Sequence, residues 1–67
     1  MPDELLFEFL RGRDRFRCEL RDRGAHGVEA QIFHEGAVLI AHRFASRDLA
    51  VRWAEGERRE IERRAAG

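Results

Sequence analysis

Apolar and polar residues alternate along much of the first two thirds of the chain. Within residues 15–22, Phe16, Cys18 and Leu20 alternate with the charged residues Arg15, Arg17, Glu19 and Arg21. A period of two over this length is typical of a strand with one buried face. The same alternation recurs in residues 4–11, 28–32 and 38–42. The pattern therefore predicts four short strands.

Glycine-containing segments separate these strands and indicate how they pair. Gly12-Arg13 suits a two-residue type II′ hairpin turn with glycine at its first position. This turn places Leu5 opposite Leu20, and it makes the inner face of the first hairpin apolar throughout. Residues 23–27 form a second loop with two glycines, and pairing across it places Leu20 opposite Ala30.

The third connection allows two registers. A three-residue loop over residues 34–36, with glycine in the left-handed third position, keeps Val38 and Ile40 on the inner face. A two-residue loop over residues 35–36 turns both side chains outward. We expect the three-residue loop, because a shift of one residue exchanges the faces of a strand.

The last third of the chain has the spacing of an amphipathic helix. Ser46 is a good N-cap, and Asp48 lies in the first turn, where the helix dipole favours an anion. We expect a helix over residues 47–64, with its charged last turns, residues 58–64, extending past the sheet. The fold class is therefore α+β: a four-stranded antiparallel β-meander with one C-terminal α-helix packed on one face (ββββα), forming a single domain over residues 1–67.

The inner faces of the strands and the apolar face of the helix together predict a core. Its expected members are Leu5, Phe7, Phe9, Phe16, Cys18, Leu20, Val28, Ala30, Ile32, Val38, Ile40, Phe44, Leu49, Trp53 and Ile61. The imidazole of His42 is expected on the same inner face. Trp53 is the largest side chain available to fill the space between sheet and helix.

The small size of the chain favours self-association. A domain of 67 residues buries only about 60% of its unfolded surface. Cys18 is the only cysteine, which excludes an intrachain disulfide and suits a reducing cytoplasm. The 13 basic residues are all arginine and are balanced by 13 acids. We expect no membrane association, because no apolar run approaches the length of a membrane-spanning helix.

One helix covers one face of a sheet, so the other face is the expected binding surface. Its apolar residues form the candidate interface, for a second copy of the chain or for another protein: Leu6, Leu10, Phe33 and Leu39. The alternative is a solvated face, since scattered apolar residues are normal on protein surfaces. From these features we expect a non-enzymatic bacterial binding or assembly module, most simply a homodimer.

The same face suggests a second function. Residues 11–23 contain six arginines and three acids, and arginines beside aromatic rings on a sheet can hold single-stranded nucleic acid. The candidate nucleic-acid contacts are Arg13, Arg15, Arg17, Arg23 and Arg43. In strand order alone, four antiparallel strands followed by a helix resemble the repeat unit of PUR proteins and Whirly-type proteins. That resemblance implies a dimer that binds single-stranded nucleic acid on its sheet.

Neither catalysis nor cofactor binding is expected. His26, His34 and His42 are each eight residues apart, which is not a zinc-ligand spacing. The Cys18 thiol is expected in the core and inert, and Ser46 is expected to act as a helix cap. The chain also lacks a glycine-rich phosphate loop. We therefore expect no catalytic, cofactor or metal-binding residues, although a site at a dimer seam remains an alternative.

Overall fold

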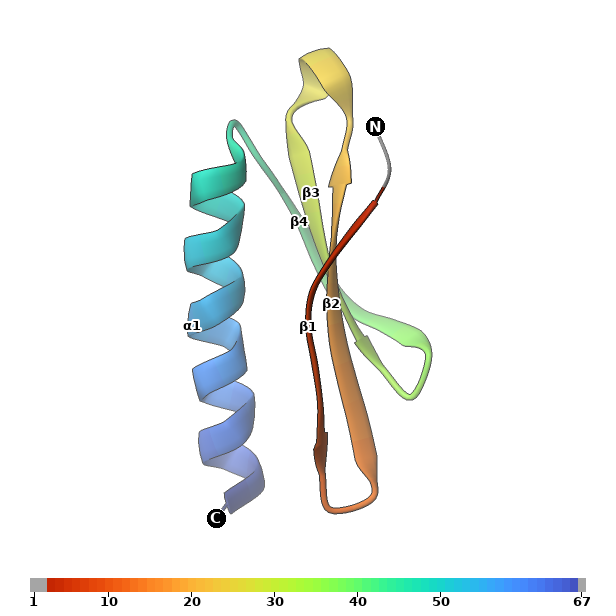
Figure 1. Cartoon of the computed structure of the whole chain (residues 1–67). Helices are drawn as coiled ribbons and strands as arrows, with labels where there is room; N and C mark the ends of the chain where they lie inside the picture. The colour runs from red at the N-terminus through yellow and green to blue at the C-terminus, as the bar shows by residue number, and fades with distance from the viewer. Residues whose placement is uncertain (1–2, 67) are drawn as a thin grey trace.

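The computed structural model describes residues 3–66, and it forms one sheet and one helix (Figure 1). The elements are β1 (Glu4–Arg11), β2 (Asp14–Asp22), the 3₁₀ turn η1 (Gly24–His26), β3 (Val28–His34), β4 (Ala37–Phe44) and α1 (Arg47–Ala66). The strands are antiparallel in the order β1-β2-β3-β4, and α1 stands against one side of the sheet. The predicted ββββα fold is confirmed.

The first hairpin has the predicted turn, but β1 contains a bulge. Gly12 has a φ of +62°, as a type II′ turn requires, and Phe7 lies opposite Cys18 as expected. Between Leu5 and Phe7 the register shifts, and Leu6 is the extra residue. Leu5 therefore lies opposite Glu19 with 55% of its surface exposed. The prediction that Leu5 belongs to the core is wrong, because the bulge exchanges the faces of the first residues of β1.

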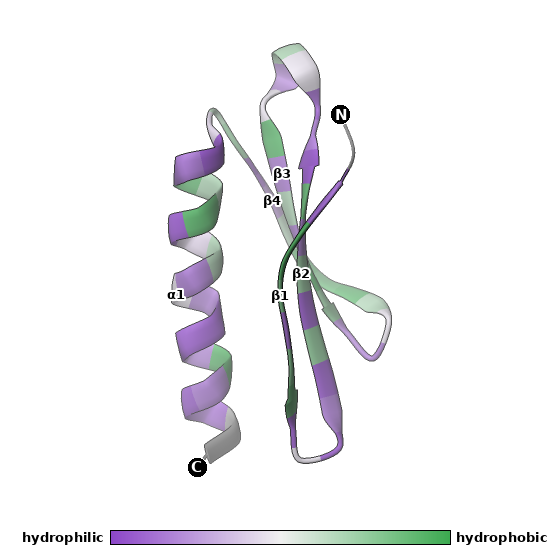
Figure 2. Cartoon of the chain, viewed as in Figure 1, coloured by the Kyte–Doolittle hydropathy of each residue, from purple (hydrophilic) through white to green (hydrophobic). Residues whose placement is uncertain are grey.

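The second hairpin agrees with the sequence prediction. Leu20 lies opposite Ala30, and Cys18 lies opposite Ile32. All four side chains are buried. Along β2, apolar and charged residues form alternate bands (Figure 2), so one face points to α1 and the other to solvent.

The third hairpin differs from the prediction. Glu35 and Gly36 both have positive φ, +54° and +83°, and they form a two-residue loop of the type I′ kind. The three-residue loop is therefore wrong, and Val38 is exposed instead of buried. A bulge at Leu39 then restores the inward orientation of Ile40, which lies opposite Ile32. A bulge in β4, and not a longer turn, therefore places Ile40 in the core.

The core lies between the inner sheet face and the side of α1 that faces it. The buried apolar residues are Phe7, Cys18, Leu20, Ala30, Ile32, Ala50 and Ala54. Partly buried side chains pack against them: Leu6, Phe9, Val28, Ile40, Phe44, Val51, Trp53 and Ile61. The two fully buried alanines of α1 let the helix backbone approach the sheet closely. Phe16, also predicted for the core, is partly buried and stacks on Phe9.

Both ends of α1 are fixed to the rest of the fold. At its start, the backbone N–H of Leu49 donates a hydrogen bond to the Ser46 hydroxyl at 3.3 Å, which confirms the N-cap. The Leu49 side chain is 47% exposed, so its assignment to the core is wrong. At the other end, Ile61 packs against the core and the guanidinium of Arg58 lies over the rings of β1. The last turns of the helix therefore cover the sheet instead of extending past it.

Candidate functional site

The outer face of the sheet, opposite α1, is organised around a buried carboxylate. Glu19 is only 9% exposed and accepts hydrogen bonds from the guanidinium groups of Arg17 and Arg21. Arg21 also binds Asp3 at 2.7 Å and the side-chain oxygen of Gln31 at 2.5 Å. A buried carboxylate needs such partners, because an unpaired buried charge is strongly destabilising. These arginines therefore have a structural role within the face.

A second acid occupies the end of this face nearest η1. Arg23 donates two hydrogen bonds to Glu29, the shorter at 2.6 Å, and Arg43 lies opposite Glu29 in the sheet. The hydrogen bond from Arg23 lowers the pKa of Glu29, and the charges of Arg23, Arg43 and Arg21 add to this effect. Two of the candidate nucleic-acid contacts, Arg23 and Arg43, thus share an acid within the fold.

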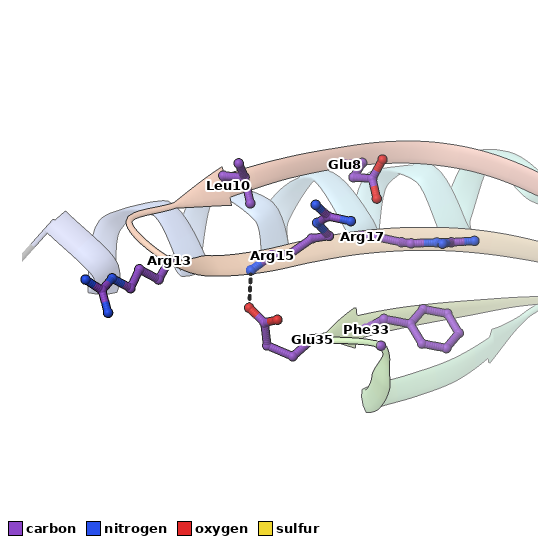
Figure 3. A pocket seen from close by; sticks show the side chains of 8 residues that line it. Glu8, Leu10, Arg13, Arg15, Arg17, Phe33 and Glu35 are labelled. Carbon is purple, nitrogen blue, oxygen red and sulfur yellow. Dashed lines mark hydrogen bonds between the residues drawn. The ribbon is translucent and has the colours of Figure 1, made fainter.

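The remaining candidate nucleic-acid contacts line a hollow of about 390 Å³ on the outer face (Figure 3). Its lining residues are Glu8, Leu10, Arg13, Arg15, Arg17, Phe33, Glu35 and Gly36. The guanidinium carbon of Arg17 lies 5.8 Å from the centre of the Phe33 ring. The Arg13 side chain points away from the other labelled residues. The hollow combines one aromatic ring, three arginines and two acids.

The four residues of the candidate interface do not form one patch. Leu10, 61% exposed, and Phe33, partly buried, both line the outer hollow. Leu6 packs into the core, and Leu39 lines a groove on the helix side together with Ile61. The expected single apolar patch on the outer face is therefore wrong. Both displacements follow from the bulges, since each bulge changes which side chains face outward.

An exposed apolar surface lies instead along β4. Val38 and Leu39 are each 55% exposed, and β4 is the last strand in the sheet order, next to β3. On α1, the exposed Leu49 lies one turn before Trp53, whose ring contacts β4 at 5.5 Å from the Phe44 ring. Val38 and Leu39 are called the β4 edge surface below.

The opposite edge of the sheet is protected by charge. β1 pairs with β2 alone, and it carries Glu4, Glu8 and Arg11 along its eight residues. Charged residues on an edge strand discourage pairing with another chain. On β4 the only residue with a fixed charge is Arg43, near its end. The two edges of the sheet therefore differ in charge.

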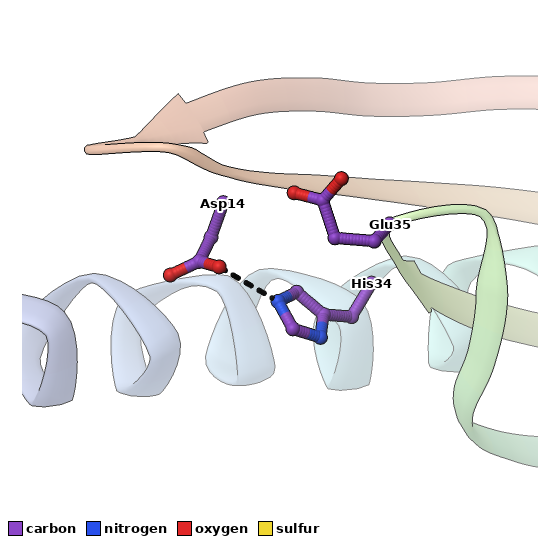
Figure 4. Close-up of side chains that lie close together, drawn as sticks. All are labelled: Asp14, His34 and Glu35. Carbon is purple, nitrogen blue, oxygen red and sulfur yellow. Dashed lines mark hydrogen bonds and ion pairs between the residues drawn. The ribbon is translucent and has the colours of Figure 1, made fainter.

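A cluster of potential metal ligands joins two turns of the sheet (Figure 4). Among residues 3–64, whose side chains are described, the ligand atoms of Asp14, His34 and Glu35 lie within 4.8 Å of one another. The Nε2 atom of His34 is 3.1 Å from a carboxylate oxygen of Asp14. Sequence reasoning missed this cluster because it compared only the spacing of histidines. The available signal was the sheet register, which brings the first residue of β2 beside the end of β3.

The other groups considered for chemistry lie elsewhere. His42 packs edge-on against the Trp53 ring, with 5.2 Å between ring centres, on the predicted inner face. His26 is in η1, at the other end of the sheet from the cluster. Burial raises the pKa of the Cys18 thiol to about 11, so the thiolate that nucleophilic chemistry needs is disfavoured.

Comparison of the chain with protein-family models, curated proteins and solved structures finds no match in any of the three. The resemblance to PUR and Whirly-type proteins remains one of strand order. Within residues 3–66, no helix has both the length and the apolar character needed to cross a membrane.

Proposed function

We propose that this domain is a non-enzymatic assembly module that forms a homodimer through its β4 edge surface. The observation that carries the proposal is the exposure of Val38 and Leu39, at 55% each, on a strand whose outer edge has no partner strand within residues 3–66. Unpaired backbone groups on an edge strand bind readily to another strand. Apolar side chains beside them add burial to that contact.

A second copy of the chain is the partner that fits this edge best. In a two-fold symmetric dimer, one contact covers the exposed edge of both chains at once. Antiparallel pairing of two β4 strands extends each sheet to eight strands, with both helices on the same face. The exposed Leu49 then lies on the side of α1 that faces the partner. The added burial supplements the small core that the described residues form.

Sedimentation velocity at micromolar concentrations tests the homodimer. We expect the unmodified chain to sediment as a dimer, and Val38→Lys and Leu39→Lys to sediment as monomers. Leu5→Lys is the matched control, because Leu5 is also 55% exposed but lies on the β1 edge. A monomeric parent chain, or equal loss of dimer in Leu5→Lys and Val38→Lys, contradicts the proposal.

Single-stranded nucleic-acid binding is the second candidate function. It is favoured by the outer hollow, where Arg17 lies over Phe33 and Arg15 lines the same space. A base stacked on Phe33 with a phosphate near Arg15 fits this arrangement. Fluorescence anisotropy with a labelled oligonucleotide, at low and high salt, tests it. Binding should weaken steeply with salt and in Arg15→Gln, whereas no binding at low salt excludes this function.

Both candidate functions suit a cytoplasmic protein. Cys18 is a free, buried thiol, and free thiols persist in a reducing compartment. Localisation of a tagged full-length chain tests this expectation, and export of the chain contradicts it.

A further inference from the structure

We propose that Asp14, His34 and Glu35 bind a divalent transition-metal ion of the zinc class, a function beyond the proposed dimer. The three residues come from two turns that the sheet holds side by side (Figure 4). Asp14 directly follows the β1–β2 turn, while His34 ends β3 and Glu35 begins the β3–β4 turn. Because β2 and β3 are hydrogen-bonded neighbours, the distance between these turns is fixed by the sheet.

The separation of the ligand atoms suits a shared cation. Ligands about 2.1 Å from one ion, at angles between octahedral and tetrahedral, lie about 3.0–3.4 Å apart. The Nε2 atom of His34 and the Oδ1 atom of Asp14 are hydrogen-bonded at 3.1 Å, a separation that also falls in this range, so an ion can bind there by replacing the shared proton. The carboxylate of Glu35 completes the cluster within 4.8 Å. Its side chain is exposed, so an ion can draw it inward at little cost in packing.

Two contacts orient His34 and keep the Glu35 carboxylate near it before any ion binds. The His34 imidazole stacks on the Phe16 ring, with 4.8 Å between ring centres and 23° between ring planes. The backbone N–H of Arg15 donates a hydrogen bond to one carboxylate oxygen of Glu35 at 2.7 Å. That bond leaves the second oxygen of Glu35 available as a ligand. Groups that orient metal ligands in this way raise the affinity of a site.

Glu35 is also an unexpected residue for its turn. Its φ of +54° lies in the left-handed region, where asparagine and glycine are favoured at the first position of a type I′ turn. The hydrogen bond that the Glu35 carboxylate accepts from the Arg15 backbone offsets part of the cost of this conformation.

The types of ligand atom indicate which class of ion the site prefers. One imidazole nitrogen and two carboxylates suit zinc, cobalt, nickel or manganese better than magnesium or calcium, which prefer oxygen ligands alone. With a neutral imidazole the cluster carries two negative charges. Arg64 lines the groove beside Asp14 and His34, but its guanidinium is paired with Glu60 at 3.2 Å. Its repulsion of an incoming cation is thereby reduced.

Isothermal titration calorimetry of the full-length chain with zinc chloride tests the site. We expect one zinc ion per chain, and at least a tenfold loss of affinity in each of Asp14→Asn, His34→Gln and Glu35→Gln. Glu35→Gln retains an oxygen that can accept the Arg15 hydrogen bond, so it separates ligation from folding. Circular dichroism verifies that each variant is folded. If His34→Gln unfolds, the zinc affinities of Asp14→Asn and Glu35→Gln still test the site.

His26→Gln is the matched control, because it removes an exposed histidine at the far end of the sheet. We expect its zinc affinity to equal that of the parent chain. The proposal is overturned if zinc fails to bind, if binding survives in His34→Gln, if His26→Gln loses affinity equally, or if magnesium binds as tightly as zinc. Sedimentation in the presence of a chelator shows whether dimerisation fails separately from metal binding.

Discussion

The carboxylate of Glu4 accepts two hydrogen bonds from the guanidinium of Arg47, at 3.0 and 2.6 Å, and joins β1 to the first turn of α1. The hydrogen bond from Arg47 lowers the pKa of Glu4 below its ordinary value. A carboxyl group with a lowered pKa in the folded state stabilises the fold above its unfolded pKa. That contribution is lost as pH falls through the folded pKa.

We therefore expect Arg47→Gln to destabilise the domain slightly at neutral pH, with the difference from the parent chain disappearing in acid. Both groups are exposed, so the effect is small and weakens with added salt. Urea denaturation at neutral pH and below about pH 4 measures it. Arg52→Gln, an exposed arginine of the same helix, is the control. A parent–variant difference that is equal at both pH values contradicts the prediction.

Two glycines of the β2–β3 connection both have positive φ but have different surroundings. Gly27, with φ of +89°, lies so close to Phe44 that a Cβ atom would overlap with the Phe44 carbonyl oxygen. Gly24, with φ of +60°, has open space at that position. We expect Gly24→Ala to cost about 1 kcal/mol, for the backbone conformation alone. Gly27→Ala should cost several times as much, as measured by urea denaturation, and equal costs would refute the close approach.

The raised pKa of Cys18 predicts loss of stability in alkaline solution. The unfolded thiol ionises near its ordinary value of 9.0, whereas the folded thiol ionises at about 11. The contribution of the protonated thiol to the free energy of unfolding is therefore fully present below the unfolded pKa. It decreases as pH rises towards the folded pKa. The total loss is about 3 kcal/mol, from a cost of about 1.4 kcal/mol per pH unit.

The effect of Cys18 ionisation can be measured without interference from lysine or tyrosine side chains, because the chain contains neither residue. Denaturation between about pH 8 and 10 should show the decrease in the parent chain. Cys18→Ala should be less stable at neutral pH, because it leaves a small cavity, but its stability should change little across that range. Parallel curves for the two proteins would contradict the assignment.

Arg58 fixes the second half of α1 to β1. Its guanidinium carbon lies 5.4 Å from the ring centre of Phe7 and 5.3 Å from that of Phe9, and it also pairs with Glu62 at 3.7 Å. We expect Arg58→Ala to cost about 1 kcal/mol, chiefly through loss of the contacts with the rings. Glu62→Ala removes only the ion pair and should cost a few tenths of that, since exposed pairs contribute little. Chemical denaturation of both variants compares the two contributions.

The fold could be predicted because the strand, turn and helix signals in the sequence all agreed with one ββββα arrangement. Alternation marked the strands, Gly12 marked the first turn, and Ser46 marked the start of the helix. The bulges could not be predicted from hydropathy. Leu5 and Leu6 are the same residue type, so either can face the core, and the choice depends on packing against α1. The same ambiguity applies to Val38, Leu39 and Ile40, where a shorter turn and a bulge replace a longer turn.

The candidate sites depended on these same details. The apolar patch expected on the outer face does not form, because Leu6 and Leu39 are the two bulge residues and do not face outward. The arginines were correctly placed on or beside the outer face, but their acidic partners could not be read from register alone. Arg17 lies opposite Glu8, yet it pairs with Glu19 on its own strand. The proximity of Asp14, His34 and Glu35 depends on how two turns meet, which sequence spacing does not express.

The meander order of the sheet has a consequence for how the chain reaches this structure. Every strand is hydrogen-bonded to its neighbour in sequence, so the sheet can grow one hairpin at a time without closing a long loop. Topologies dominated by such short separations fold faster than sheets that pair distant segments. Glu4 and Arg47 are 43 residues apart in the sequence, so their ion pair can form only after the hairpins between them have formed. The docking of the helix is therefore expected to complete folding, and Trp53 fluorescence in stopped-flow experiments would report that final step.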